Sequence, residues 1–264
     1  MTAAAAARAE APSPAACPVC DGGAGAPYAA QDGHDFLRCG DCGFVYLARM
    51  PDDAELAALY NARPDDVGAA GLDPKRRSRA RRALGKLPRL IRYAWGKDAL
   101  DLGCGGGVMV AALGRIARRA VGLDIDAAAV AAARAAYPAH EFVAADYRAA
   151  AFDDGEFDFV HASEIIEHVN DLAAFMGFLA RVVRPGGHVY VTTPDIGHPK
   201  VPADPRDWDV FAPPRHVQFF DRATLGRLFA RHGFTARRTY RDAKPGLQML
   251  FVKRQVGERA AESE

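Results

Sequence analysis

The stretch Ala99-Leu100-Asp101-Leu102-Gly103-Cys104-Gly105-Gly106-Gly107 is an apolar run that reaches an acid and then opens into a glycine-rich turn. Apolar residues then recur at helical spacing, at Met109, Ala112, Leu113 and Ile116. A strand, a glycine turn and a helix in this order let a ligand approach the backbone of an α/β sheet, because glycine lacks the Cβ that would block it. The spacing is Gly-x-Gly-x-Gly, and Val108 stands where a dinucleotide fingerprint has its third glycine, which argues against a nicotinamide or flavin pyrophosphate.

Two further predicted strands also end in acidic residues. Residues 120–123 are apolar and lead into Asp124, and residues 141–145 lead into Asp146. An acid at the end of the second strand can accept hydrogen bonds from both hydroxyls of a ribose, as in dinucleotide folds. Asp126 is predicted to cap an alanine-rich helix that ends near residue 136.

The same alternation of strand and helix continues to the end of the domain. Apolar segments predict a fourth strand over residues 157–162, a fifth over 188–194 and a last one over 247–252. Asp221 is predicted to cap a helix that ends at Gly233. Strand–helix units therefore cover about residues 90–252, which predicts an α/β fold. The alternative is an α/β domain that binds some other nucleotide.

These motifs resemble those of class I S-adenosylmethionine (SAM) methyltransferases. The resemblance implies a Rossmann-like, seven-stranded methyltransferase sheet with helices on both faces, and SAM as the cofactor. In that family the glycine turn wraps the methionine and ribose part of SAM, while an Asp at position 146 takes the adenine amino group and its neighbour packs on the ring. The cofactor-binding residues that we expect on this basis are Asp101, Gly103, Cys104, Gly105, Asp124, Ile125, Asp146 and Tyr147.

Four of the five cysteines form two C-x2-C pairs, Cys17 with Cys20 and Cys39 with Cys42, separated by eighteen residues. This spacing fits a structural zinc ribbon, in which four thiolates complete a tetrahedron with no open position for catalysis. Two disulfides or four free thiols are the alternatives; disulfides need an oxidising compartment, and no export signal is evident. Cys104 lies apart from these pairs and is interpreted as a small packing residue. The whole layout resembles bacterial class I methyltransferases that carry an amino-terminal zinc ribbon and act on small molecules and sugars.

A basic segment precedes the first strand of the predicted sheet. Residues 75–92 contain nine basic residues and no acids, and Asp73 and Pro74 are predicted to start a helix there. Its predicted apolar stripe consists of Ala80, Ala83, Leu84 and Leu87. The segment is either a solvated basic face of a helix that covers the sheet, or an electrostatic guide for a phosphate-bearing substrate or RNA. The absence of interleaved aromatic residues disfavours nucleic acid.

Candidate catalytic residues follow the fourth strand. If a helix begins there, Glu164 and His168 share one face toward the carboxyl edge of the sheet, where ligands bind in such folds. His168 is the first candidate general base, because imidazole titrates near neutral pH. Glu167 and His216 are the other candidates. The alternative is an acid pair at a helix start beside a structural histidine.

A long insert separates the fifth strand from His216. It contains six prolines from Pro194 to Pro214, counting both ends, together with Trp208 and Phe211. Connections of this length in a compact domain are usually functional or disordered. Its aromatic content favours a lid that covers the substrate.

The predicted organisation is a disordered leader (residues 1–16), a zinc ribbon (17–48), a helical linker (49–92), a SAM-binding domain (93–254) and a frayed tail (255–264). Half of the residues are hydrophobic, a quarter are charged and the net charge is +1, which is usual for a globular enzyme. We therefore expect a cytoplasmic methyltransferase, with no membrane partner, that acts on an oxygen of a sugar or other secondary metabolite. The alternatives are carbon or nitrogen methylation of a nucleotide-linked sugar, or a non-catalytic SAM-binding scaffold.

Overall fold

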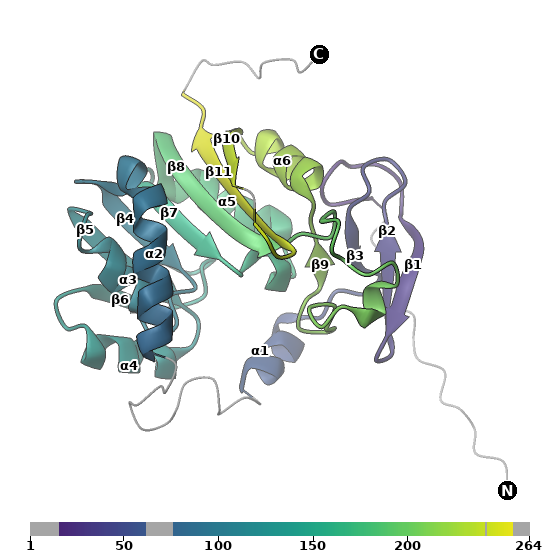
Figure 1. The fold of residues 1–264 in the computed structure, drawn as a ribbon, viewed down its shortest axis with the longest axis horizontal. Coiled ribbons are helices and arrows are strands. Elements are labelled where there is room, and N and C mark those ends of the chain that lie inside the picture. Colours follow the sequence, from purple (N-terminus) through teal and green to yellow (C-terminus); the bar gives the residue numbers. More distant parts are fainter. Residues whose placement is uncertain (1–15, 62–75, 241, 256–264) are drawn as a thin grey trace, which may run out of the picture.

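A seven-stranded sheet forms the larger part of the molecule in the computed structural model, which describes residues 16–61, 76–240 and 242–255. Its strand order is β10-β11-β8-β7-β4-β5-β6 (Figure 1). Strand β11 is antiparallel to both of its neighbours, whereas β8, β7, β4, β5 and β6 pair in parallel. The strands are β4 (Asp98–Leu102), β5 (Arg119–Asp124), β6 (Glu141–Ala144), β7 (Phe157–Ser163), β8 (Val183–Pro194), β10 (Phe234–Tyr240) and β11 (Gly246–Lys253). The predicted α/β sheet is thereby confirmed.

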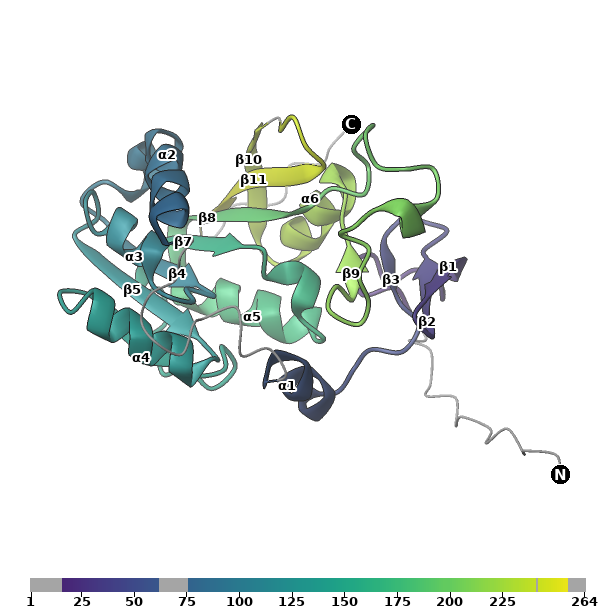
Figure 2. The same ribbon diagram turned by 60° about the horizontal axis from the view of Figure 1, so that its bottom comes forward.

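Helices cover both faces of this sheet (Figure 2). One face packs against α2 (Arg76–Ala94), α3 (Val108–Leu113) and α4 (Ala127–Ala136), and the other against α5 (Leu172–Val182) and α6 (Arg222–Arg231). Neighbouring residues of β7 point into different cores, because side chains alternate along a strand: Phe159 packs under α2 and Val160 under α5. A strand buried on both faces explains why its sequence is almost continuously apolar.

Side-chain caps start two of these helices where the sequence predicts them. The Asp126 carboxylate accepts from the backbone N–H groups of Ala128 and Ala129, and Asp221 forms a capping box with Thr224 at the start of α6. Each cap satisfies backbone donors that a helix start leaves without a partner.

Two details of the predicted helices are wrong. Helix α3 ends at Leu113, and Ile116 lies in the turns beyond it, where the backbone N–H of Arg115 donates to Ala112 and that of Ile116 to Leu113, three residues back and not four. In α2 the side chain of Leu84 is 40% exposed. The helix is rotated so that its buried positions are Ala83, Leu90 and Ala94.

A second, four-stranded sheet forms the cysteine-containing module. It consists of β1 (Ala26–Gln31), β2 (His34–Arg38), β3 (Val45–Leu47) and β9 (Gln218–Phe219), and a helix, α1 (Asp53–Asn61), follows it in the chain. Strand β9 pairs with β3 although it comes from the far end of the long insert. The sequence gives no sign of this fourth strand, which lies outside the predicted ribbon boundaries of 17–48.

The aromatic residues of the insert do not form an open lid. Trp208 and Phe211 are buried, 6% and 1% exposed, and pack with Phe36 of β2 and Phe219 of β9. A short turn, η2 (Pro205–Asp207), precedes them. The prolines and aromatic residues therefore build a core between the insert and the cysteine module, and the expectation that these aromatic residues cover a substrate is wrong.

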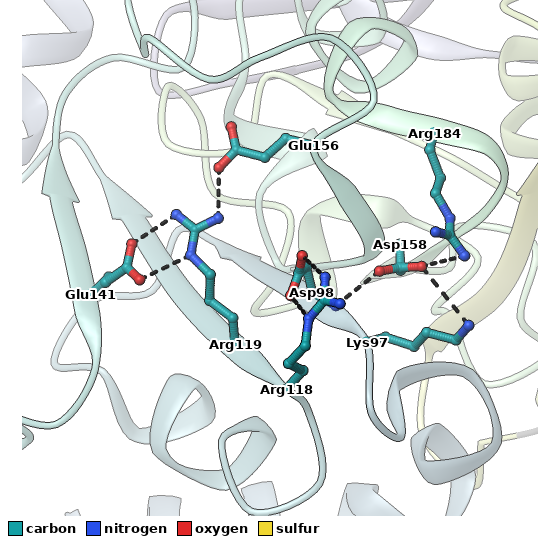
Figure 3. A network of polar contacts seen from close by, with 8 residues as sticks. All are labelled: Lys97, Asp98, Arg118, Arg119, Glu141, Glu156, Asp158 and Arg184. Atoms are coloured by element: carbon teal, nitrogen blue, oxygen red, sulfur yellow. Dashed lines mark hydrogen bonds and ion pairs between the residues drawn. The ribbon is translucent and has the colours of Figure 1, made fainter.

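Ion pairs hold the amino ends of the parallel strands together (Figure 3). Arg119 bonds Glu141 and Glu156, while Arg118 pairs with Asp98 and Arg184 with Asp158. Most of these side chains are partly exposed, so each pair contributes little to stability. The network closes the amino edge of the sheet, and the opposite, carboxyl edge is where the candidate site lies.

Some predicted features fall outside the described residues: the leader up to residue 15, the helix start at Asp73 and Pro74, and the tail from residue 256. Among the described residues, no helix has the length and apolar character needed to cross a membrane.

Candidate active site

The glycine turn after β4 adopts backbone conformations that suit glycine. Gly103, Gly105 and Gly107 have φ angles of 73°, 47° and 76°. A Cβ added to Gly107 would lie 2.7 Å from the ring of Phe142, so this position serves close packing. A Cβ added to Gly105 would meet no atom within 4 Å. The turn is therefore open at Gly105, where a ligand can approach the backbone.

Asp124, at the end of β5, holds this turn in place. One carboxylate oxygen accepts from the backbone N–H of Gly105 at 2.7 Å and the other accepts from that of Asp126 at 2.9 Å. Burial raises the pKa of Asp124, although these two hydrogen bonds oppose the effect. Each carboxylate oxygen has a second lone pair and can accept one more hydrogen bond. Ile125 next to it is 59% exposed.

Asp101 and Cys104 point into the protein. The carboxylate of Asp101 is 2.7 Å from Nδ1 of His161 in β7, and both residues are buried. Cys104 is also buried, and burial raises the pKa of its thiol. Its side chain occupies the space above Gly122, where a Cβ would lie 2.7 Å from its sulfur. The side chains of Asp101 and Cys104 therefore lie on the buried side of the turn and support its position.

Asp146 and Tyr147 follow β6. Asp146 forms two hydrogen bonds with the guanidinium of Arg148, which lower the pKa of its carboxyl, and Arg148 also reaches Asp53 of α1. The ring of Tyr147 packs against Phe175 and Phe178 of α5. Asp146 thus lies near the carboxyl edge of the sheet, as expected, but its carboxylate already pairs with the guanidinium of Arg148.

The residues after β7 do not form the expected helix. Glu164 has a φ angle of 57°, and only a single 3-10 turn, η1 (Ile166–His168), follows it. The backbone N–H of Glu164 donates to the carbonyl of Thr192, and its carboxylate accepts from the Thr192 hydroxyl at 2.8 Å. These bonds extend the pairing with β8 by one residue, and the positive φ angle of Glu164 is incompatible with the first turn of a helix. Glu164 and His168 therefore do not share a helix face.

The three candidate catalytic residues nevertheless come together. Glu167 is fully buried, and its carboxylate accepts from the Thr193 hydroxyl at 2.9 Å. The rings of His168 and His216 lie 4.7 Å apart between centroids, and Nε2 of His168 is 3.9 Å from the Glu167 carboxylate. Burial raises the pKa of Glu167 and lowers that of His216 to about 4. The backbone bond from Val217 N–H to the Glu167 carbonyl brings the insert to this point.

Lys86, at the carboxyl edge of the sheet, is a residue of the site that the sequence does not predict. Its ammonium group donates to the Ser163 hydroxyl at 3.1 Å, and a chain of hydrogen bonds continues through Thr192 to Glu164. Burial lowers the pKa of Lys86. Its position three residues after the buried Ala83 places it on the inward side of α2, and this spacing was the available signal.

Residues 75–239 match the model of a methyltransferase domain family. The chain belongs to this family. Among curated relatives it is 34% identical to a probable S-adenosylmethionine-dependent methyltransferase of Mycolicibacterium smegmatis, over 55% of each chain. It is 39% identical to a ubiquinone biosynthesis O-methyltransferase of Thiobacillus denitrificans, over 37% of this chain and 44% of that protein. The chain thus spans about half the length of these curated relatives.

Solved structures show the same fold. A putative methyltransferase structure, determined in a complex with the Haloferax volcanii Trm112 methyltransferase activator, aligns with a TM-score of 0.58 at 18% identity and covers 72% of this chain and 99% of that one. The 1,6-didemethyltoxoflavin-N1-methyltransferase of Burkholderia thailandensis aligns with the same TM-score at 16% identity, covering 87% and 99% of the two chains. At these identities the likeness concerns the fold alone.

The four cysteines of the amino-terminal module cluster beside the methyltransferase domain. The sulfurs of Cys17 and Cys42 are 3.7 Å apart, those of Cys20 and Cys39 are 3.6 Å apart, and all four lie within 4.8 Å of one another. Four sulfurs about 2.3 Å from one zinc ion would be spaced by about 3.8 Å, so the arrangement fits a tetrahedral site. A disulfide needs a bond of about 2.05 Å, and all four thiols are free. Burial raises the pKa of the Cys17 and Cys42 thiols, whereas backbone hydrogen bonds from Cys42 and Asp41 lower the pKa of Cys39 although burial opposes them.

Proposed function

We propose that this protein is a SAM-dependent methyltransferase that acts on an oxygen of a small-molecule acceptor in the cytoplasm. The observation that carries the proposal is the open turn at Gly105, clamped by Asp124, in a chain that belongs to the methyltransferase domain family. Methylation of carbon or nitrogen on a nucleotide-linked sugar is the second candidate.

The cofactor end of the site would use the carboxyl edge of β4, β5 and β6. SAM supplies a methyl group on a positively charged sulfur. Asp124 has lone pairs left for the ribose hydroxyls, and the exposed Ile125 offers an apolar surface for a base. Asp146 can accept from the adenine amino group on a lone pair that Arg148 leaves, and Tyr147, whose ring packs against Phe175 of α5, is the next residue in the chain.

The acceptor end would use the cluster of Glu167, His168 and His216. Nδ1 of His168 is 2.7 Å from the Arg215 carbonyl, which can only accept, so this nitrogen carries a proton. Nε2 is then the atom that takes a proton from an acceptor hydroxyl. The main contribution to the rate of such a displacement is alignment of the acceptor with the methyl group, and a positioned base adds to it.

The cysteine module would hold one structural zinc ion through Cys17, Cys20, Cys39 and Cys42. Four protein ligands leave no position for a substrate, so the zinc ion contributes to folding of the module and not to catalysis. The basic side chains of α2 that the structure describes are exposed apart from Lys86, although Arg89 also donates to Gln248 of β11. This exposure favours a solvated face over a phosphate guide.

Two measurements test the proposal. Titration calorimetry should show SAM binding to the purified chain, and labelled SAM should transfer its methyl group to a compound in fractionated cell extract. A chain that binds no SAM would instead be a scaffold with a degenerate site. Binding with label appearing on carbon or nitrogen would favour the second candidate.

A further inference from the structure

The cluster of Glu167, His168 and His216 brings one carboxylate and two imidazoles to a common point. One ligand-type atom from each residue lies within 4.8 Å of the other two. Two of the residues belong to η1, and the third comes from the insert that precedes β9. Two separate segments of the chain therefore meet at this point, held by the bond between Val217 N–H and the Glu167 carbonyl.

Backbone carbonyls fix the orientation of both rings. Nδ1 of His168 is 2.7 Å from the Arg215 carbonyl, and Nδ1 of His216 is 2.6 Å from the Val210 carbonyl. A carbonyl can only accept, so both Nδ1 atoms carry protons and each neutral ring has its lone pair on Nε2. Histidines that bind metals almost always donate their other ring N–H in this way.

The carboxylate of Glu167 has a lone pair that the chain does not use. Its Oε2 atom accepts from the Thr193 hydroxyl, whereas its Oε1 atom is buried and has no hydrogen-bond partner among the described residues. Nε2 of His168 is 3.9 Å away, beyond hydrogen-bonding distance. A buried carboxylate in this state, with the Glu164 carboxyl also close to it, is costly unless it takes up a proton or a cation binds it.

We propose that Glu167 Oε1 and the Nε2 atoms of His168 and His216 bind one divalent transition-metal cation. Two imidazoles with one carboxylate suit Zn²⁺, Fe²⁺ or Co²⁺, whereas Mg²⁺ and Ca²⁺ prefer oxygen ligands alone. Three protein ligands leave at least one coordination position for water or an oxygen of another molecule. In this respect the site differs from the four-cysteine site.

The inference goes beyond the proposed function and does not depend on it. With a cation bound, His168 Nε2 is a ligand and not a base, and the charge of the cation lowers the pKa of a bound hydroxyl. The number of metal ions bound per chain can be measured without an assay of methyl transfer. If no metal ion binds here, His168 Nε2 remains the base of the proposed function, and failure to bind SAM would leave the metal site in place.

Metal analysis of the purified chain tests the proposal. Protein that is reduced, dialysed against Zn²⁺ and desalted should contain two zinc ions per chain, as measured by elemental mass spectrometry. His216→Ala and Glu167→Gln should each contain one, and Cys39→Ser should also contain one. His198→Ala is the matched control, because His198 lies in the same insert outside the cluster, and it should keep two.

Substitution by Co²⁺ separates the two sites by their absorption. The cysteine site gives an intense thiolate-to-cobalt band in the near ultraviolet, which should persist in His216→Ala and Glu167→Gln and show that both variants are folded. Glu167→Gln keeps the size of the side chain. Its number of zinc ions per chain therefore tests the proposal even if His216→Ala loses that band. One metal ion in the wild type, or two in every variant that keeps the band, would overturn the proposal.

Discussion

Asp124 lies where β5 ends, and its two carboxylate oxygens already hold the turn at Gly105 and the chain at Asp126. The same carboxylate is the proposed acceptor for the ribose hydroxyls. A substitution there therefore acts on the ligand and on the turn that receives it. Asparagine is the informative replacement, since it keeps the size and one acceptor oxygen.

We expect Asp124→Asn to weaken SAM binding by about 1–3 kcal/mol, because charged hydrogen bonds to the ribose become neutral or are lost. Calorimetry measures the affinity, and thermal unfolding serves as the control for the turn. An affinity equal to that of the wild type would show that the ribose lies elsewhere.

The affinity of the wild type for SAM should also depend on pH. Burial raises the pKa of Asp124, so its carboxylate is neutralised at a higher pH than an ordinary aspartate as the solution is acidified. Affinity should be constant near neutral pH and fall in the acid range, and Asp124→Asn should lack this fall. Identical pH profiles for the two proteins would contradict the assignment.

The substitution His168→Ala tests the end of the proposed site that would bind the methyl acceptor. SAM affinity should stay almost unchanged while turnover falls about 10²–10⁴-fold, because the acceptor hydroxyl loses Nε2 either as its base or as a ligand of the cation that activates it. Single-turnover methyl transfer measures this, with His198→Ala as the control. Normal turnover in His168→Ala would leave alignment as the source of the rate.

At the scale of elements, the glycine turn and the strands around it follow local rules, and the sequence predicts them well. Apolar runs mark the parallel strands, and Asp126 and Asp221 cap α4 and α6 through contacts within three residues. The turn after β7 follows tertiary contacts instead. Glu164 is held by Thr192, twenty-eight residues away, and no local pattern carries that information.

Gly105→Val should abolish SAM binding and leave the far-ultraviolet circular dichroism nearly unchanged. The φ angle of 47° disfavours a β-branched residue, and the added side chain would occupy the open side of the turn. Gly177→Ala in α5, where a Cβ also meets no atom, is the control and should bind SAM normally. Retained binding in the valine variant would place the cofactor away from this turn.

At the scale of the whole molecule, the cysteine module and the methyltransferase domain share a core. Phe44 of the module contacts Phe220, and Arg231 of α6 donates to the Val19 carbonyl between the first two cysteines. The sequence predicts the four cysteines as a group because their spacing is local. It does not predict the docking, which depends on β9 and on buried residues of the insert.

Cys39→Ser should release zinc and loosen more than the module itself. Because β9, Trp208 and Phe211 pack on the same sheet, we expect faster hydrogen exchange in residues 16–47 and in 195–220, while β4 to β8 stay protected. Cys104→Ala is the control and should keep the zinc. Exchange confined to residues 16–47 would show that the two parts are energetically independent.

The pairing of β3 with β9 also has a consequence for the order of events during synthesis. Val45 pairs with Phe219, so the two strands are separated by about 170 residues of chain. The cysteines leave the ribosome early, yet the sheet beside them keeps an unpaired edge until nearly the whole methyltransferase domain has been made. Such distant pairings form slowly, and an open edge invites pairing with other chains. The cysteine module precedes the methyltransferase domain in the chain, yet its sheet is completed only after most of that domain has been synthesised.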